Sequence, residues 1–196
     1  MNTPHNQDQH DFSSLAHEIA KRDLYPRLFG VSPDRIRYAV MDFSKGEWYR
    51  LCDGNLGIDV IVKVDYGLKR PLRFSIQERF RSPKFFDFDD ITITSWNNLS
   101  DRPSELYKMV AQFFVYGVMD DAENPTRFLR AMAVNVPDLV MMRGGGLVKN
   151  NNGNRNDRGQ DFEAYSISQI KKFNLARLSF DGREWTDYYA RTSASY

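Results

Sequence analysis

Cysteine and histidine are both scarce in this chain. Cys52 is its one cysteine, and its three histidines, His5, His10 and His17, all stand near the beginning. A lone cysteine excludes an internal disulfide and a cysteine-based zinc site. Histidines confined to one end leave no base for a serine or cysteine triad, and no His-Glu-x-x-His zinc motif occurs.

Neither sign of charge is in excess. The 27 basic residues nearly balance the 26 acidic ones, for a formal net charge of +1. Bulk electrostatics therefore give no argument for a nucleic-acid partner, and any basic surface must be a local patch.

Long apolar runs and a signal-peptide pattern are also missing from the sequence. The hydrophobic residues come in short segments, far below the length that a membrane-spanning helix needs. We therefore expect a cytoplasmic protein with no membrane partner.

The length of 196 residues predicts a single domain with an ample core. Polar composition predicts flexible tails over 1–12 and 184–196, which leaves 13–183 as the domain. Within it, 144–160 combines glycine, asparagine and basic residues, so we expect a flexible basic loop there. Such a loop either grips a nucleic-acid backbone or is an ordinary surface insertion.

Two stretches of alternating apolar and polar residues, over 57–65 and 72–81, predict a β-hairpin around a turn with Gly and Pro. Side chains two apart share one face of a strand, so one face of the hairpin is apolar. The opposite face would gather an acid, an amide and two cations: Asp59, Gln77, Lys63 and Arg79. The same alternation sends Glu78 to the apolar side.

This hairpin resembles the core of the PD-(D/E)XK nuclease superfamily, over roughly Ala16 to Leu139. That family has an Asp at the start of one strand and an (E/Q)-x-K signature on the next. Here Asp59, preceded by Gly57-Ile58, and Gln77-Glu78-Arg79 take those places. The Gln form is similar to Mrr-like restriction nucleases. Two positions depart from the usual pattern, because Gln77 replaces an acid and Arg79 replaces a lysine.

The resemblance implies an α/β (α+β) fold with a restriction-endonuclease-like core, a central mixed β-sheet flanked by helices. It also implies a hydrolase, a DNA endonuclease of the restriction, homing or repair type that uses Mg²⁺ or Mn²⁺. The alternative is a catalytically inactive member of the fold that serves as a DNA-binding or assembly subunit, which the Gln and Arg replacements motivate. We favour the enzyme because Asp59 and a cation are retained. A homodimer is expected by analogy, since a single-site enzyme needs two copies to cut both strands.

Within this resemblance Asp59 is the central metal ligand and Gln77 adds its carbonyl oxygen. Glu78 contributes to the metal through its backbone or through a bulge of the strand, or else pairs with a cation on the apolar side. Glu18, on the first predicted helix, matches the family's first-helix carboxylate, or is a solvated helix-face residue. His17 on the same helix is expected at the surface.

The cations beside these ligands would stabilise charge that develops on the phosphate. Arg79 has this role by its place in the motif. Arginine stays protonated and so cannot act as a base. If a lysine is needed to position or deprotonate water, Lys63 lies on the same face of the hairpin and would substitute.

Further cations expected to contact DNA follow the hairpin or belong to the flexible loop. They are Arg81, Lys84, Lys149, Arg155 and Arg158. The segment 82–90 also carries three phenylalanines, which either stack on bases at ~1–3 kcal/mol each or fold back over the core.

The rest of the chain predicts two helices and several more strands. One helix begins at Ser13 or Ser14, and apolar residues at helical spacing predict another over Leu106–Val118, packed across the sheet. Further strands are expected over 35–43, 47–51, 91–94, 127–136, 162–167 and 175–180.

Overall fold

The structure is a computed structural model that describes residues 4–41, 45–145, 154–155 and 159–188. The first helix begins at Pro4, within the stretch expected to be a tail, and a π-helical turn carries it into a second helix. The helical segments are α1 (Pro4–Ile19), η1 (Ala20–Leu24), α2 (Tyr25–Phe29), η2 (Pro33–Arg35), α3 (Glu47–Arg50), η4 (Leu51–Asn55), η5 (Pro83–Phe85), α4 (Glu105–Lys108), α5 (Val136–Gly144) and α6 (Ile167–Lys172).

A seven-stranded sheet forms the centre of the molecule, in the order β1-β2-β3-β6-β7-β10-β11. Its strands are β1 (Ile36–Val40), β2 (Val60–Val64), β3 (Leu72–Arg81), β6 (Phe113–Met119), β7 (Phe128–Asn135), β10 (Ala176–Phe180) and β11 (Trp185–Asp187). Strands β3 and β6 are parallel, whereas the other neighbours are antiparallel. The predicted hairpin and the predicted central mixed sheet flanked by helices are therefore confirmed.

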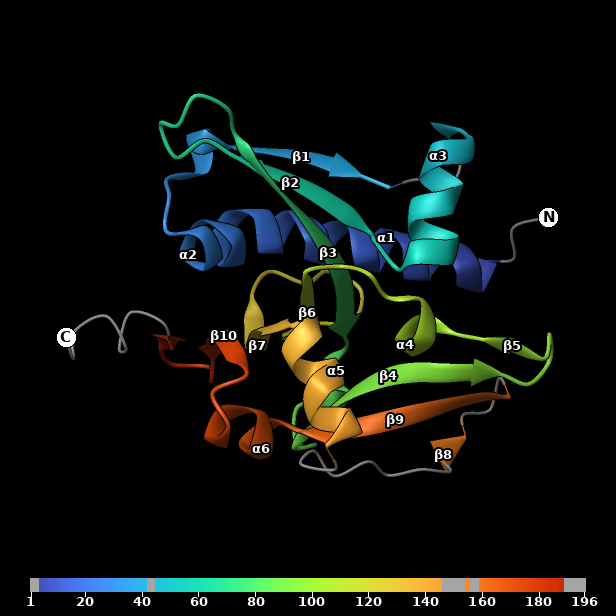
Figure 1. The fold of residues 1–196 in the computed structure, drawn as a ribbon. Coiled ribbons are helices and arrows are strands. Elements are labelled where there is room, and N and C mark those ends of the chain that lie inside the picture. Colours follow the sequence, from blue (N-terminus) through green and yellow to red (C-terminus); the bar gives the residue numbers. More distant parts are fainter. Residues whose placement is uncertain (1–3, 42–44, 146–153, 156–158, 189–196) are drawn as a thin grey trace.

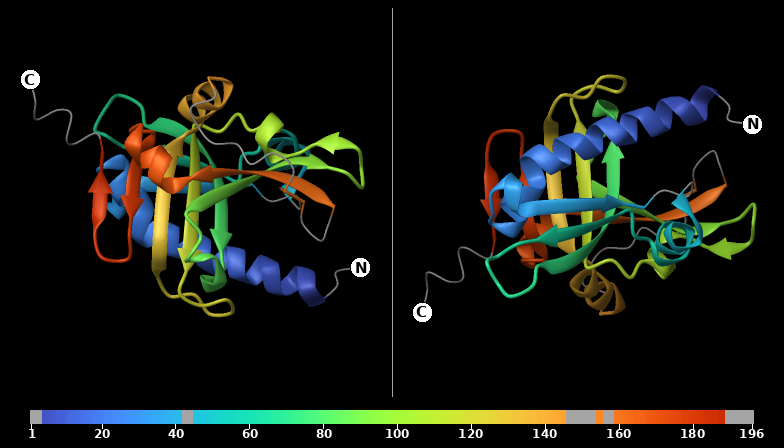
Figure 2. Two further views of the ribbon diagram at one scale, coloured as in Figure 1. Left: turned by 90° about the horizontal axis from the view of Figure 1, so that it is seen from below. Right: turned by 90° about the horizontal axis from the view of Figure 1, so that it is seen from above.

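Helix α1 lies across one face of this sheet, and a second sheet lies on the other side (Figures 1 and 2). The second sheet has the order β5-β4-β9-β8. Its strands are β4 (Asp90–Asn97), β5 (Arg102–Pro103), β8 (Asn154–Arg155) and β9 (Gln160–Ser166). The molecule thus has three layers, with the seven-stranded sheet in the middle.

Two hydrophobic cores fill the spaces between the layers. They form because the apolar side chains of the seven-stranded sheet alternate between its two faces. Val115 and Met119 of β6 point toward the helices α1 and α2. Phe114, Tyr116 and Val118 of the same strand point toward β4 and β9. Because β6 is buried on both faces, its sequence is a continuous apolar run and does not alternate.

Strand β11 lies within the second expected tail, over 184–196, and two predicted elements are of a different kind in the structure. The helix predicted over Leu106–Val118 is wrong: α4 ends at Lys108, and the apolar residues that follow form β6 in the middle of the sheet. The strand predicted over 47–51 is also wrong, since α3 and η4 occupy that stretch.

Among the described helices, none has both the length and the apolar composition that crossing a membrane would require.

Candidate active site

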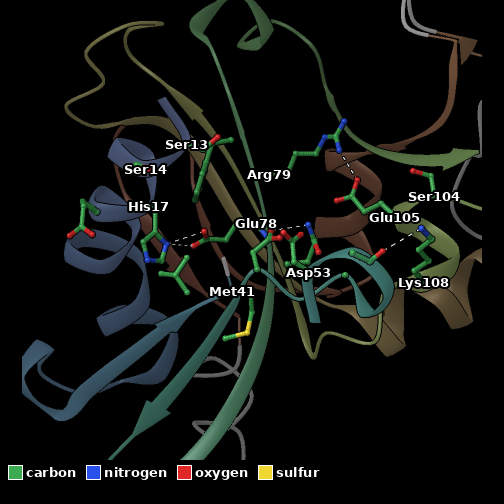
Figure 3. Close-up of a pocket in the computed structure, with 17 residues that line it drawn as sticks. Ser13, Ser14, His17, Met41, Asp53, Glu78, Arg79, Ser104, Glu105 and Lys108 are labelled. Atoms are coloured by element: carbon green, nitrogen blue, oxygen red, sulfur yellow. Dashed lines mark hydrogen bonds and ion pairs between the residues drawn. The ribbon is translucent and has the colours of Figure 1, made fainter. Parts of the chain in front are cut away.

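Strand β3 changes partner halfway along its length. It pairs with β2 from Leu72 to Ile76 and with β6 from Ile76 to Arg81. A cavity of about 650 Å³ opens beside its second half, between the start of β2, helix α1 and helix α4 (Figure 3). The residues around Gln77 are therefore placed where the hairpin ends and the sheet leaves an opening.

Asp59 stands immediately before β2 and faces this opening. Its Oδ2 accepts the backbone N–H of Glu78 at 2.7 Å and the Nε2 of Gln77 at 2.8 Å. Its own N–H donates to the carbonyl of Ile76 at 2.9 Å. The Asp59 carboxylate thus satisfies an edge N–H of β3 that no strand reaches, and Asp59 and Gln77 lie together as the alternation predicted.

The Asp59 carboxylate is in an unfavourable place for a negative charge. Burial raises its pKa well above the usual value, and the negative charges of Glu78, Asp53 and Glu105 raise it further, against the lowering by the Glu78 N–H. Desolvation and like charges both disfavour the ionised form. A cation bound nearby would relieve both effects.

The amide of Gln77 is only half satisfied. Its Nε2 donates to Asp59, but its Oε1 is buried without a hydrogen-bond partner among the described residues. Gly57 lies beside this oxygen with φ +56°, and a Cβ at that position would come within 3.2 Å of Oε1 and 3.1 Å of the Met109 Cα. Glycine meets both requirements, the left-handed backbone and the close approach, without strain.

Glu78 points to the other side of β3, toward helix α1, as the alternation predicted. The Nδ1 of His17 lies 2.9 Å from its Oε1 and 3.0 Å from its Oε2, and the hydroxyl of Tyr25 donates to Oε1. Burial, followed by the charge of Glu78, raises the pKa of Tyr25 well above its usual value. His17 is 7 % exposed, so the expectation that it lies at the surface is wrong. Its partner explains this, because Glu78 draws the imidazole inward.

Arg79 shares the face of Gln77 and is held by an acid. Its Nη1 donates to Oε2 of Glu105 at 2.6 Å, and the same oxygen accepts the Thr94 hydroxyl at 3.0 Å. The Arg79 Nε is buried without a partner in the described part of the chain. The guanidinium is therefore fixed at the cavity wall and keeps donor capacity.

Three residues of the site were not found from the sequence. Asp53, Glu105 and Lys108 line the same cavity as Asp59, and the Lys108 Nζ donates to the carbonyl of Gly54 at 3.4 Å. Spacing i, i+3 puts Glu105 and Lys108 on one face of α4. That signal was hidden because α4 was taken as the start of a longer core helix.

Lys63 and Glu18 lie apart from the cluster. Lys63 is on the predicted face, but its cross-strand partners are Arg37 and Arg73, about 13 Å along β2 from Asp59 at ~3.3 Å per residue. The Glu18 side chain lies at the cavity rim, is 66 % exposed and pairs with Lys21 at 2.8 Å. The lysine that the fold brings to the cavity is Lys108.

The cations expected to contact DNA have separate locations. Arg81 is partly buried and donates to the Thr92 hydroxyl at 2.7 Å; burial and the charge of Arg79 lower its pKa to about 10. Lys84 lies over the Phe85 ring, 5.2 Å from its centroid. Arg155 belongs to β8, whereas Lys149 and Arg158 lie outside the described residues.

The phenylalanines after β3 divide between the two interpretations. Phe85 and Phe86 pack against the core under β4 and β9, as a roof. Phe88 is exposed.

Comparisons with known proteins identify no family. No protein-family model and no curated protein matches the sequence. A solved structure with a likeness to the chain is restriction endonuclease MspI in complex with its cognate DNA, at 8 % identity and a TM-score of 0.38, with 83 % of this chain and 80 % of that chain covered. These figures are too low to support an argument, so the function is argued from the site itself.

The donor atoms of the site fit a cation that keeps much of its own water. Within the described residues, no group of three or more His, Cys, Asp or Glu side chains is arranged to hold a metal ion. Mg²⁺ is typically bound through one or two carboxylates plus substrate phosphate, with several waters retained. Asp59 would supply one carboxylate, and the Gln77 Oε1, which has no partner in the described residues, would supply a second oxygen.

Proposed function

We propose that this protein is a divalent-cation-dependent endonuclease that hydrolyses phosphodiester bonds of DNA at the Asp59–Gln77 cavity. The observation that carries the proposal is the buried Asp59 carboxylate. Its pKa is raised by burial and by the charges of three nearby acids. It stands beside an amide oxygen with no partner in the described residues. A fold that gathers acids around a buried carboxylate at one opening is arranged for a cation.

Asp59 and the Gln77 Oε1 would hold the ion, Mg²⁺ or Mn²⁺. When bound, such an ion supplies Lewis-acid activation of water and compensation of charge at the phosphate. The backbone N–H of Glu78 keeps the Asp59 carboxylate in place at 2.7 Å, on the strand that also carries Gln77. Both donor residues are thus positioned by the hairpin and not by a loop.

Arg79 and Lys108 would serve the phosphate and the attacking water. The Arg79 guanidinium, anchored by Glu105 at 2.6 Å, offers its remaining N–H donors to a phosphate oxygen. Lys108 can carry a proton to or from water, which an arginine cannot do. In this arrangement Lys108 takes the lysine role first considered for Lys63.

The alternative function is DNA binding without catalysis. One observation favours it: two of the acids near Asp59 already have protein partners. Glu105 pairs with Arg79, and Glu78 is hydrogen-bonded by His17 and Tyr25. In this case Asp59 would be a remnant of a catalytic site.

A plasmid-nicking assay separates these two functions. We expect the wild-type protein to cut with Mg²⁺ or Mn²⁺ and not in EDTA. Asp59→Ala should lose cleavage while DNA binding stays equal or becomes tighter, because a negative charge near phosphate is removed. Asp87→Ala is the matched control, since Asp87 is exposed and does not line the cavity. Duplex binding without cleavage in either metal would establish the non-catalytic alternative, and cleavage by Asp59→Ala at the control rate would place the chemistry elsewhere.

A further inference from the structure

A row of three cations crosses β1 and the two strands of the hairpin, on the face that carries Asp59 and Gln77. Lys63 of β2 lies directly opposite Arg37 of β1 on one side and Arg73 of β3 on the other. Residues paired in this way, and residues two apart along a strand, share one face of a sheet. The row therefore faces the same way as Asp59 and Gln77.

Beside the row, the chain forms a hollow of about 520 Å³. Four cations line it, namely Arg35, Arg37, Lys63 and Lys69, together with the acids Asp34 and Asp65. The Asp65 Oδ1 already accepts the N–H of Gly67 at 2.8 Å. A hydrogen bond from Ser32 and the nearby charges of Arg35 and Arg37 lower the pKa of Asp34. The hollow keeps an excess of positive charge.

Two of the three side chains in this row, those of Lys63 and Arg73, have no partner within the described chain. Like charges directly opposite each other in a sheet destabilise it. Lys63 and Arg73 are both exposed, and neither side chain takes part in an ion pair or hydrogen bond within the described chain. Arg37 is the exception, since its Nη1 donates to the carbonyl of Asp34 at 2.7 Å. An arrangement that costs stability in the free protein is favourable when an anion lies across it.

We propose that the row Arg37–Lys63–Arg73 binds the phosphate backbone of a DNA duplex whose cleaved strand lies at the Asp59–Gln77 cavity. The inference rests on the proposed function for its choice of partner. The row is about 13 Å from Asp59 at ~3.3 Å per residue, well within one duplex turn of ~34 Å. Three strands at ~4.8 Å spacing spread the cations over about 10 Å, which matches several phosphates at one per ~3.4 Å of axis in each strand.

Salt-dependent binding of a labelled duplex to the full-length chain, in EDTA, tests this surface without cleavage. Each phosphate contact contributes about 0.9 to the slope of log K against log salt. We expect Lys63→Ala/Arg73→Ala to lose affinity and to lower this slope by about 1.8. The control Lys172→Ala/Arg183→Ala removes the same charge from exposed positions on α6 and just before β11, and should keep the wild-type slope.

Equal slopes for the row variant and the wild type would overturn the inference. The inference would also be overturned if the row variant kept the wild-type slope on the duplex but lost binding to phosphatidylserine vesicles. The row would then bind a lipid surface. Lys63→Gln/Arg73→Gln retains side-chain bulk and repeats the test if the alanine variant fails to fold. A wild type that cuts no DNA but shows the row-dependent slope would refute the catalytic proposal alone, and a cutting enzyme with a row-independent slope would refute the surface alone.

Discussion

Strand β3 has two different polar environments on its two faces, only one residue apart in the sequence. On the α1 side the Glu78 carboxylate is 9 % exposed and receives His17 and Tyr25. On the opposite face Gln77 leaves a buried oxygen without a partner in the described residues, and Asp59 carries a charge that its surroundings disfavour. Residues of both faces line the same cavity.

The difference indicates which face maintains the fold and which face serves function. Buried polar groups in native proteins are almost always paired, so the exceptions need an explanation. On the α1 side the Glu78 carboxylate follows the rule and fastens helix α1 to the sheet, and the exception there is the His17 Nε2, which has no partner in the described residues. The Asp59–Gln77 side breaks it, and sites that lower stability are commonly the sites of function.

The largest effect is expected on the Glu78 face. Glu78→Ala should lower the free energy of unfolding by about 3 kcal/mol, because it leaves His17 and Tyr25 buried without their shared acceptor. The backbone N–H that Asp59 accepts is retained. Urea unfolding measures the change. The control is Glu18→Ala, whose exposed pair with Lys21 should contribute no more than about 0.5 kcal/mol. Equal losses for the two variants would remove the distinction between the faces.

A smaller effect is expected beside the Gln77 amide. Gly57→Ala should cost about 2 kcal/mol, since an alanine is strained at φ +56° and its Cβ meets the Met109 backbone at 3.1 Å. Gly67→Ala separates the two causes, because Gly67 also has positive φ, at +77°, but open space around it. We expect only about 1 kcal/mol there. Thermal unfolding of both variants in EDTA gives the difference, and no difference would mean that the close approach is unimportant.

The smallest effect has the opposite sign. Asp59→Asn should raise stability by about 1 kcal/mol at neutral pH in EDTA, because it removes a charge that burial and three acids disfavour while an acceptor oxygen remains. Chemical denaturation with and without EDTA checks it. A loss of stability in this variant would show that Asp59 is a structural residue like Glu78.

The hairpin and the facing of its residues were predictable from the sequence because both depend on a period of two. Alternation alone brought Asp59 to Gln77 and sent Glu78 to the opposite side. Alternation could not show that β3 extends beyond the end of β2 and leaves an opening, since this depends on the register of β3 against β6. It also could not supply the partners of Glu78, which come from α1 and α2, far earlier in the chain.

The wrong helix over 106–118 and the site residues missed on α4 have one physical cause. Over 106–118, helical spacing and a continuous apolar run are both present, and periodicity cannot separate a buried helix from a strand buried on both faces. Packing decides for the strand: a Cβ on Gly117 would come within 2.5 Å of the Phe128 ring. The same error concealed Glu105 and Lys108, which a short helix before the strand delivers to the cavity.

Calorimetric titration of Mn²⁺ into the wild-type protein and into Asp59→Asn tests the central claim most directly, because it measures cation binding without DNA and without turnover. We expect saturable binding to the wild type, loss of that binding in Asp59→Asn, and wild-type binding in the exposed control Asp87→Asn. Equal binding to the wild type and Asp59→Asn, or no binding to the wild type, would contradict it.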